Sequence, residues 1–302
     1  QSKMVKRPIA GFLHIIVYVG FIIINLELLE IIIDGLFGTH RVFSFMGGFY
    51  DVLIASFEIL AVLVLVSVIV FWLRRNVIKL KRFVSSDLKN WPKSDANYIL
   101  YFEIVLMSLF LIMNAADLWL QEMNVHHYNQ AGSFPISQFI SPLFDGLSEG
   151  VVVVIERTAW WLHICGILVF LNYLYFSKHL HILLAFPNTY FADLNAKGKF
   201  DNLESVTNEV KLMMDPSADP FGAPANPETV PAKFGASDVQ DLNWVQLLNA
   251  YTCTECGRCT SSCPANLTGK KLSPRKIMMD TRDRLEEVGK NIDLNNGVFL
   301  SD

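Results

Sequence analysis

Residues 53–73 read LIASFEILAVLVLVSVIVFWL, a run in which Glu58 is the one charged residue. An α-helix rises about 1.5 Å per residue, so about 20 apolar residues are enough to cross the hydrocarbon core of a bilayer. This run is therefore predicted to form a membrane-spanning helix.

Three further apolar stretches of similar length predict a bundle of four membrane helices. They cover about residues 9–33, 98–120 and 151–178. Of the 302 residues, 52% are hydrophobic and 18% are charged, whereas soluble domains carry about 25% charged residues. The net charge of −4 also argues against a nucleic-acid-binding protein, which needs clustered lysine and arginine. The chain is thus predicted to be mainly α-helical, with a membrane bundle over residues 1–192.

Lysine and arginine are distributed unevenly between the segments that flank these stretches. Three lie in the N-terminal tail and seven in residues 74–97, whereas the first connection contains Arg41 alone and residues 121–150 contain none. Positively charged residues accumulate on the cytoplasmic side of a membrane. Both termini of the chain are therefore predicted to be cytoplasmic. A secretory signal is the weaker interpretation of the first stretch, because its apolar run is too long.

Four of the five cysteines lie close together, at Cys253, Cys256, Cys259 and Cys263, with Pro264 directly after the last. This C-x2-C-x2-C-x3-C-P spacing is that of bacterial ferredoxins, in which the fourth cysteine normally binds the other cluster of a pair of [4Fe-4S] clusters. Zinc is the alternative, but zinc sites usually combine two separated pairs of ligands, often with histidine. The fifth cysteine, Cys165, is most simply a packing residue of the fourth stretch.

Two [4Fe-4S] clusters need more cysteines than the chain contains. Either one cluster takes all four motif cysteines, or a second motif follows Asp302. We favour the second interpretation, in which residues 241–302 form part of a ferredoxin-like domain with short helices near 241–250 and 274–288. A basic turn follows the motif and either steers an acidic partner or is simply solvated; it contains Lys270, Lys271, Arg275 and Lys276.

Residues 193–240, between the membrane region and the motif, are polar and rich in proline. The prolines lie at short intervals, at Pro216, Pro220, Pro224, Pro227 and Pro231. Proline fixes φ and removes a backbone donor, so the segment is predicted to be an extended linker. Plain disorder would explain the same composition.

Three histidines lie in the predicted membrane helices or at their ends, at His14, His163 and His181. Histidines inside membrane helices are usually functional, and pairs of them on facing helices can hold haem. His163 and His181 are 18 residues apart, which on one continuous helix is about five turns and about 27 Å on the same face. This predicts an inner b-type haem between His14 and His181, and a second, outer haem on His163. The alternative is that these histidines pack in the core without a ligand.

The sequence leaves the partner of His163 open. Our choice is His40 in the first connection, because Gly35 and Gly38 allow the chain to fold back. His179 lies about 160° around the helix from His163 and is assigned to the surface or to a haem propionate. The alternatives to His40 are His126, His127 and Met113.

Three acidic residues of the first stretch follow i, i+3, i+7 spacing and so share one face of a helix: Glu27, Glu30 and Asp34. Carboxylates inside a membrane are candidates for function, and we assign this stripe to a proton or quinone path. The equally open alternative is that they pair with Arg41 or Arg157 or face the outer water. Arg157 is also a candidate contact for a haem propionate.

The two halves of the chain resemble two known families. The membrane half resembles the cytochrome b (gamma) subunit of respiratory nitrate reductase, whose haem-bearing end is similar to SKHLH at residues 177–181 followed by Pro187. Residues 244–264, with the sequence Cys-Thr-Glu-Cys-Gly-Arg-Cys, resemble membrane-bound iron–sulfur oxidoreductases related to heterodisulfide reductase D and to the C component of anaerobic glycerol-3-phosphate dehydrogenase. The chain departs from the first family at Ile24, where the nitrate reductase protein has a second haem ligand.

The resemblance implies a quinone-linked iron–sulfur oxidoreductase in the inner (cytoplasmic) membrane of a bacterium or archaeon. It would transfer electrons between the membrane quinone pool and a cytoplasmic redox partner through one or two b-type haems and [4Fe-4S] clusters. The implied partners are lipid, quinone and either a soluble redox protein, such as an electron-transfer flavoprotein or a dehydrogenase, or the subunits of a respiratory complex. The alternative is a haem-free membrane anchor or assembly subunit of a larger respiratory complex.

Overall fold

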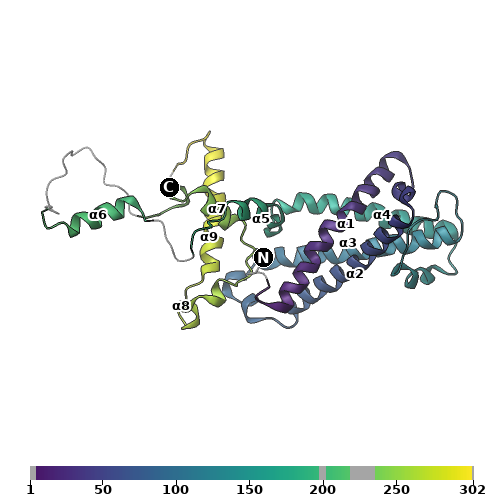
Figure 1. Ribbon diagram of the computed structural model, residues 1–302, viewed down its shortest axis with the longest axis horizontal. Helices are drawn as coiled ribbons and strands as arrows, with labels where there is room; N and C mark the ends of the chain where they lie inside the picture. The colour runs from purple at the N-terminus through teal and green to yellow at the C-terminus, as the bar shows by residue number, and fades with distance from the viewer. Residues whose placement is uncertain (1–4, 197–201, 218–234, 301–302) are drawn as a thin grey trace. The chain divides into compact units, whose positions relative to one another are not determined.

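The computed structural model describes residues 5–196, 202–217 and 235–300. Within these residues the chain is helical and contains no β-strand. It divides into two compact units, Gln1–His179 and Leu180–Asp302, which run from purple to teal and from teal to yellow in Figure 1.

The first unit contains four long helices, α1 (Pro8–Phe37), α2 (Gly48–Asn76), α3 (Trp91–Glu122) and α4 (Glu149–Leu174). Each is long and apolar enough to cross a membrane. This confirms the mainly helical fold class and the predicted number of membrane-length helices. α3 begins before the predicted boundary at residue 98, because Pro92 suits the first turn of a helix.

The connection between α1 and α2 is a compact turn. α1 ends where Gly38 adopts a left-handed φ of 66° and its N–H bonds to the carbonyl of Asp34. Glycine is favoured at this position because a Cβ would be strained there. A short 3₁₀ helix, Val42–Met46, then leads into α2. The turn brings His40 and Arg41 to the side of α3, where both contact Asp117.

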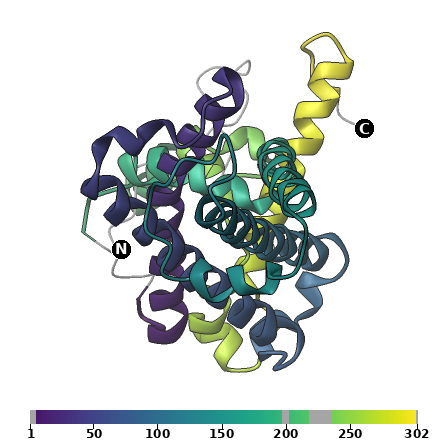
Figure 2. The same ribbon diagram turned by 90° about the vertical axis from the view of Figure 1, so that its right-hand side faces the viewer.

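The four helices pack in chain order, α1 on α2, α2 on α3 and α3 on α4. Figure 2 shows α3 and α4 nearly end-on. Glycines lie at the closest contacts: a Cβ on Gly20 would lie 2.6 Å from a methyl of Val64, and one on Gly166 would lie 2.8 Å from Leu106. Close approach through small residues is typical of membrane helices, which associate by van der Waals packing.

α4 ends at Leu174, which corrects the prediction of one continuous helix to residue 178. The backbone tightens there, since the N–H groups of Phe176 and Ser177 bond to the carbonyls of Tyr173 and Leu174, three residues earlier, and Asp95 of α3 lies at the break. Its buried carboxylate accepts hydrogen bonds from the hydroxyl of Tyr173 at 2.6 Å and from the backbone N–H of Lys178 at 3.2 Å. A backbone N–H that donates to a carboxylate cannot also continue the helical i→i−4 pattern.

The second unit contains shorter helices, α5 (His181–Tyr190), α6 (Glu204–Met214), α7 (Trp244–Tyr251), α8 (Pro264–Leu267) and α9 (Pro274–Leu294). α7 packs against both α5 and α9. α7 begins with a capping box between Asn243 and Gln246, and α9 begins with Ser273 as its N-cap. These two helices lie close to the expected ranges 241–250 and 274–288. Because α4 ends before α5 begins, His163 and His181 do not share a face of one helix.

α6 lies inside the segment that was predicted to be an extended linker, and so corrects that prediction in part. Residues 204–214 contain neither proline nor glycine. Glu204 lies in the first turn and Lys211 in the last, where each charge is favoured by the helix dipole. Four of the five linker prolines, Pro220, Pro224, Pro227 and Pro231, lie outside the described residues.

Candidate functional site

The four motif cysteines lie on the loop between α7 and α8, where Cys263 directly precedes Pro264, the first residue of α8. Two residues of the loop have a left-handed backbone, Glu255 with φ 55° and Gly257 with φ 71°. These conformations curl the loop, so that backbone N–H groups approach the sulfur atoms.

Two of the thiols accept hydrogen bonds from the loop. Cys253 accepts one from the backbone N–H of Glu255, and Cys256 accepts from the backbone N–H of Arg258 and from its Nε, which lies 3.2 Å from Sγ. Burial raises the pKa of the Cys253 thiol, and the backbone hydrogen bond does not cancel this effect. Burial acts in the same direction on Cys256, but the contacts with Arg258 outweigh it and lower the pKa of that thiol. The thiolate, which is the form that binds metal, is thereby favoured at Cys256.

Glu255 fastens the cysteine loop to α9. It is 4% exposed, and its Oε1 pairs with Nη1 of Arg282 at 3.1 Å. Breaking a buried ion pair from one side is strongly destabilising. The pair therefore fixes the left-handed residue between Cys253 and Cys256, and with it the shape of the loop.

The loop fits an iron–sulfur cluster by the chemistry of its donors. The candidate ligands are soft thiols without imidazole, and hydrogen bonds to sulfur such as those of Glu255 and Arg258 are a regular part of cluster sites. In the described part of the chain, however, no three His, Cys, Asp or Glu side chains are arranged to hold a metal ion. The donor set fits the cluster, whereas the four thiols do not converge in this structure.

The basic turn after the motif exposes less charge than its sequence suggests. Arg275 is 1% exposed, and its backbone N–H donates to the hydroxyl of Thr260. Lys276 forms an ion pair with Asp280 one helical turn later. The exposed charge of the turn is therefore carried mainly by residues 270–271.

His163 has the surroundings of a metal-binding histidine. It is 3% exposed on α4, and its ring centroid lies 5.8 Å from that of Phe110. Its Nδ1 lies 3.0 Å from the carbonyl oxygen of Leu106, which makes Nδ1 the donor and leaves the lone pair on Nε2. Histidine ligands usually donate their second nitrogen in this way. The same hydrogen bond would also satisfy a core histidine without a ligand.

The other predicted haem histidines lie on different elements. His14 is on an exposed face of α1, and His179 lies in the 3₁₀ turn after α4, where its ring packs against Phe170 at a centroid distance of 5.4 Å. His181 begins α5 in the second unit. The predicted inner pair, His14 and His181, is thus divided between the two units.

His40 does not occupy the position expected of an outer haem ligand. Its Nε2 lies 2.8 Å from Oδ1 of Asp117, and its Nδ1 accepts the backbone N–H of Asn129 at 3.1 Å, so both ring nitrogens are engaged. His163 is bonded to Leu106, which lies eleven residues before Asp117 on α3, about 16 Å along the helix axis. The structure therefore does not bring His40 and His163 to one haem.

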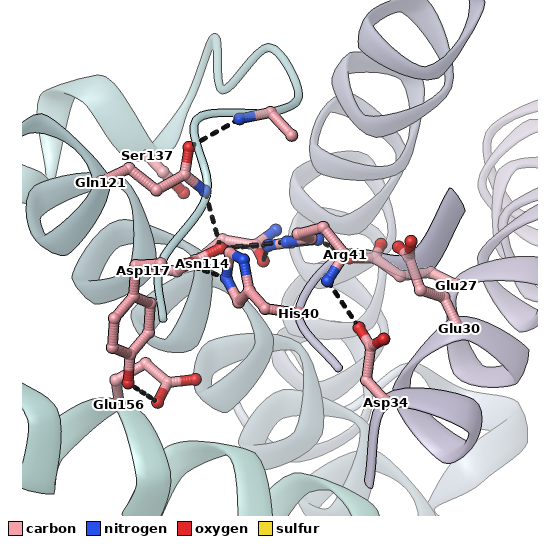
Figure 3. A network of polar contacts seen from close by, with 12 residues as sticks. Glu27, Glu30, Asp34, His40, Arg41, Asn114, Asp117, Gln121, Ser137 and Glu156 are labelled. Carbon is pink, nitrogen blue, oxygen red and sulfur yellow. Dashed lines mark hydrogen bonds and ion pairs between the residues drawn. The ribbon is translucent and has the colours of Figure 1, made fainter. Parts of the chain in front are cut away.

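Arg41 is the centre of a buried polar network, which Figure 3 shows from close by. The residue is 7% exposed. Its guanidinium donates to Asp117 from Nη2 at 2.7 Å and from Nε at 3.0 Å, to Asn114 at 2.9 Å, and to Glu27 at 3.2 Å. These bonds join α1 and α3 through the first connection. We call the set the Arg41 network; it contains Glu27, His40, Arg41, Asn114, Asp117 and Gln121.

Two acidic residues of the predicted stripe fasten the first connection. Glu30 accepts hydrogen bonds from the backbone N–H of Phe43 at 2.9 Å and from the hydroxyl of Tyr50 at 2.8 Å. Asp34 accepts from the backbone N–H groups of residues 41–42 at 2.8 and 3.2 Å. Both carboxylates therefore have a structural task.

Glu27 differs from the other two acids. It is 1% exposed, and Oε1 faces Arg41, whereas Oε2 is buried without a hydrogen-bond partner among the described residues. The sequence left open that the three acidic residues pair with Arg41. The structure shows an ion pair of this kind for one oxygen of Glu27. Arg41, the partner of Glu27, also lines a cavity of about 40 Å³, together with Glu30, Asp34 and Asp117, whereas Glu27 itself does not line it. The cavity is large enough for water, since one molecule needs about 10–15 Å³.

Arg157 lies on the same side of the bundle and is paired with its neighbour. It donates to Glu156, whose carboxylate also accepts the hydroxyl of Tyr128 at 3.0 Å. Its guanidinium lies 5.5 Å from the ring centroid of Trp160. The contact with a haem propionate stays a prediction.

Sequence reasoning missed Glu58 as a site residue. It is fully buried on α2 and accepts the backbone N–H groups of Ile136 and Ser137 at 2.9 and 3.1 Å, which holds the connection between α3 and α4 in place. The signal was present, because a lone carboxylate in an apolar run needs partners inside the protein.

Three known proteins are similar to this chain. It is 32% identical over 290 residues to the probable iron–sulfur-binding oxidoreductase FadF of Bacillus subtilis. The aligned residues are 96% of this chain and 36% of that protein. It is 28% identical over 283 residues to the EtfAB:quinone oxidoreductase of Syntrophomonas wolfei. The aligned residues are 91% of this chain and 35% of that protein. A probable membrane-anchored ferredoxin of Chromohalobacter salexigens is 41% identical over 49 residues, 16% of this chain and 7% of that protein.

No family model matches the chain, and no solved structure matches it. The chain spans about a third of the length of the first two relatives. By their names, the first two relatives are oxidoreductases, the first of them iron–sulfur-binding, and the third is a ferredoxin.

Proposed function

We propose that this chain is the membrane part and the first iron–sulfur part of an oxidoreductase that transfers electrons between the membrane quinone pool and a cytoplasmic redox partner. The cysteine loop carries the proposal, because it combines ferredoxin spacing with hydrogen-bond donors at two of its sulfurs. The same chain supplies four membrane-length helices. The names of the relatives from Bacillus subtilis and Syntrophomonas wolfei support the same assignment.

The motif cysteines would hold a [4Fe-4S] cluster. Cys263 would either complete that cluster or serve a second one whose remaining ligands follow Asp302. When bound, iron–sulfur clusters and b-type haem act as one-electron carriers. The protein contributes the shape of the loop, which depends on the pair of Glu255 and Arg282.

For the membrane unit we propose at least one b-type haem. His14 and His181 are the proposed ligands of the inner haem, as the resemblance to the nitrate reductase gamma subunit implies. His163 is the proposed ligand of a second haem, supported by the hydrogen bond from its Nδ1 to Leu106. We assign His40 to the Arg41 network instead, because both of its ring nitrogens are engaged.

Quinone chemistry also moves protons, and we assign this task to Glu27. Of the three predicted acids, Glu30 and Asp34 fasten the first connection, whereas Glu27 keeps one buried oxygen without a hydrogen bond among the described residues. The water-sized cavity beside Glu30 supports a proton route at this end of the bundle.

We place the protein in the inner (cytoplasmic) membrane with both termini in the cytoplasm, on the basis of the lysine and arginine distribution. The partner would be an electron-transfer flavoprotein, as the name of the relative from Syntrophomonas wolfei suggests. A dehydrogenase or the subunits of a respiratory complex would serve the same chemistry.

A haem-free membrane anchor is the second candidate function. It is favoured by the similarity to a probable membrane-anchored ferredoxin over 49 residues. In this case the membrane helices would hold the iron–sulfur module at the membrane without carrying electrons.

One preparation of the protein in mild detergent distinguishes the two functions. We expect non-haem iron, acid-labile sulfide and a b-type absorbance band that changes on reduction. His181→Ala should lower the haem content, whereas Lys89→Ala, a change in an exposed lysine of the second connection, should leave it unchanged. Iron and sulfide without haem would establish the anchor, and a preparation without iron and sulfide would overturn both functions.

A further inference from the structure

Two motif thiols, those of Cys253 and Cys256, accept hydrogen bonds, and Cys256 accepts more of them. Its sulfur accepts the backbone N–H of Arg258, the Nε of the same residue at 3.2 Å, and the hydroxyl of Thr254. The sulfur of Cys253 accepts one backbone N–H, that of Glu255. The two sulfurs therefore have unequal surroundings, and two side chains make the difference: the guanidinium of Arg258 and the hydroxyl of Thr254.

Two other arginines lie near the loop. Arg282 pairs with Glu255 at 3.1 Å and with Asp283 at 3.1 Å, and its charge acts on the Cys253 thiol without a hydrogen bond to it in the described contacts. Arg275 is 1% exposed, and its backbone N–H donates to Thr260. Arg258 is the arginine for which the structure gives a side-chain hydrogen bond to a motif sulfur.

Hydrogen bonds to the sulfurs and nearby positive charge set the reduction potential of an iron–sulfur cluster. Reduction adds one electron and thus negative charge, part of which lies on the sulfurs. A donor that is itself a cation stabilises this charge more than a neutral backbone N–H does. An arginine at a ligating sulfur therefore makes the cluster easier to reduce.

We propose that Arg258 sets the reduction potential of the cluster held by the motif, by donating its Nε–H to the sulfur of Cys256. This inference rests on the proposed function. The step it affects is the gain of one electron by the bound cluster from a reduced one-electron carrier of the redox partner, which is oxidised by one electron; Arg258 gives up no proton and stays protonated in both states. Arg258 is thus a positioning and tuning residue rather than a ligand.

Arg258 is exposed, so solvent screens its charge. Most of the effect should therefore come from the directed hydrogen bond rather than from charge at a distance. This separates Arg258 from the exposed Lys270 of the same unit, which carries the same charge but for which no contact with a cysteine is found among the described residues.

The test is potentiometric titration of the purified full chain, followed by electron paramagnetic resonance of the reduced cluster, for wild type and three variants. Arg258→Gln should lower the ratio of reduced to oxidised cluster about tenfold at a fixed solution potential, which equals about 59 mV for one electron. Arg258→Lys keeps the charge but loses the planar donor, and should show most of the same loss. Lys270→Gln is the matched control and should leave the potential unchanged.

Iron and sulfide contents are measured on every sample. A wild type without a cluster overturns the proposed function itself. A wild type with a cluster, together with Arg258→Gln and Lys270→Gln variants of equal potential, overturns this inference alone. Loss of the cluster from both Arg258 variants also overturns it, because Arg258 would then hold the loop rather than tune the potential.

Discussion

Arg41 shows how one residue can hold together the end of a membrane bundle. Its guanidinium bonds to Glu27 of α1 and to Asn114 and Asp117 of α3. Arg41→Gln would leave buried carboxylates without a counter-charge, a change that typically destabilises by about 3–5 kcal/mol. We expect a markedly lower melting temperature of the protein in detergent, measured by a thermal unfolding assay.

The control for Arg41→Gln is Lys89→Gln, which removes the same charge from an exposed position of the second connection. Surface changes of this kind alter stability by about 0.5 kcal/mol or less. The double variant Arg41→Gln with Asp117→Asn should recover part of the loss, since it removes both members of the pair. Equal melting temperatures of Arg41→Gln and Lys89→Gln would contradict the central role of Arg41.

Glu27 is the acidic residue whose loss should affect turnover rather than folding. Glu27→Gln keeps an acceptor for Arg41 but cannot carry a proton, so quinone-linked electron transfer should slow by about a hundredfold. The measurement is the rate of reduction of a water-soluble quinone by the full-length protein.

Glu30→Gln is the matched control, because its amide can still accept from Phe43 and bond to the hydroxyl of Tyr50. It should keep most of the turnover. If Glu27→Gln turned over as fast as Glu30→Gln, the proton route would have to lie elsewhere.

At the scale of helices, the surroundings of each glycine predict whether its replacement by alanine lowers or raises the stability of the protein. A Cβ on Gly20 would lie 2.6 Å from Val64, whose branched side chain has little freedom to move, whereas a Cβ on Gly150 would meet no atom within 4 Å. Gly20→Ala should therefore lower stability by about 1–3 kcal/mol. Gly150→Ala should be neutral or raise it by up to about 1 kcal/mol, because alanine favours helix. Thermal unfolding of the two variants in one detergent checks this, and a stabilised Gly20→Ala would show that α1 and α2 do not pack as closely.

The elements that follow from local sequence were predicted well, and those that depend on distant contacts were not. The run at residues 53–73 is membrane-length because of its own composition, and it lies inside α2. At the end of α4 the chain instead contacts Asp95, which lies on another helix and accepts the N–H of Lys178. Hydrophobic periodicity cannot register such a contact, so the face shared by His163 and His181 was wrongly extended across the break.

The candidate site divides in the same way. The spacing of the cysteines is a local signal, and it located the loop from the sequence alone. The hydrogen bond of Arg258 and the pairing of Glu255 with Arg282 depend on the fold of the loop. The sequence located the three acidic residues, but their different roles depend on contacts with the first connection and α2. Glu30 and Asp34 hold the first connection, whereas Oε2 of Glu27 has no hydrogen bond among the described residues.

At the scale of the whole molecule, the proposed orientation in the membrane rests on the distribution of lysine and arginine between the connections. The first connection contains one positive residue, Arg41, which is 7% exposed and paired with Glu27 and Asp117. The second connection, residues 77–90, and the segments beside it carry seven lysines and arginines. This excess of positive residues is the basis of the proposed cytoplasmic position of the second connection.

This orientation predicts which connections can be labelled from outside the cell. In a background in which all five cysteines are replaced by serine, Ser86→Cys in the second connection should react with a membrane-impermeant maleimide in inverted vesicles but not in intact cells. Ser133→Cys in the third connection should show the opposite pattern, since both serines are exposed and the two connections join opposite ends of α3. Labelling of Ser86→Cys in intact cells would reverse the proposed orientation and place the cysteine loop on the outer side, away from any cytoplasmic partner.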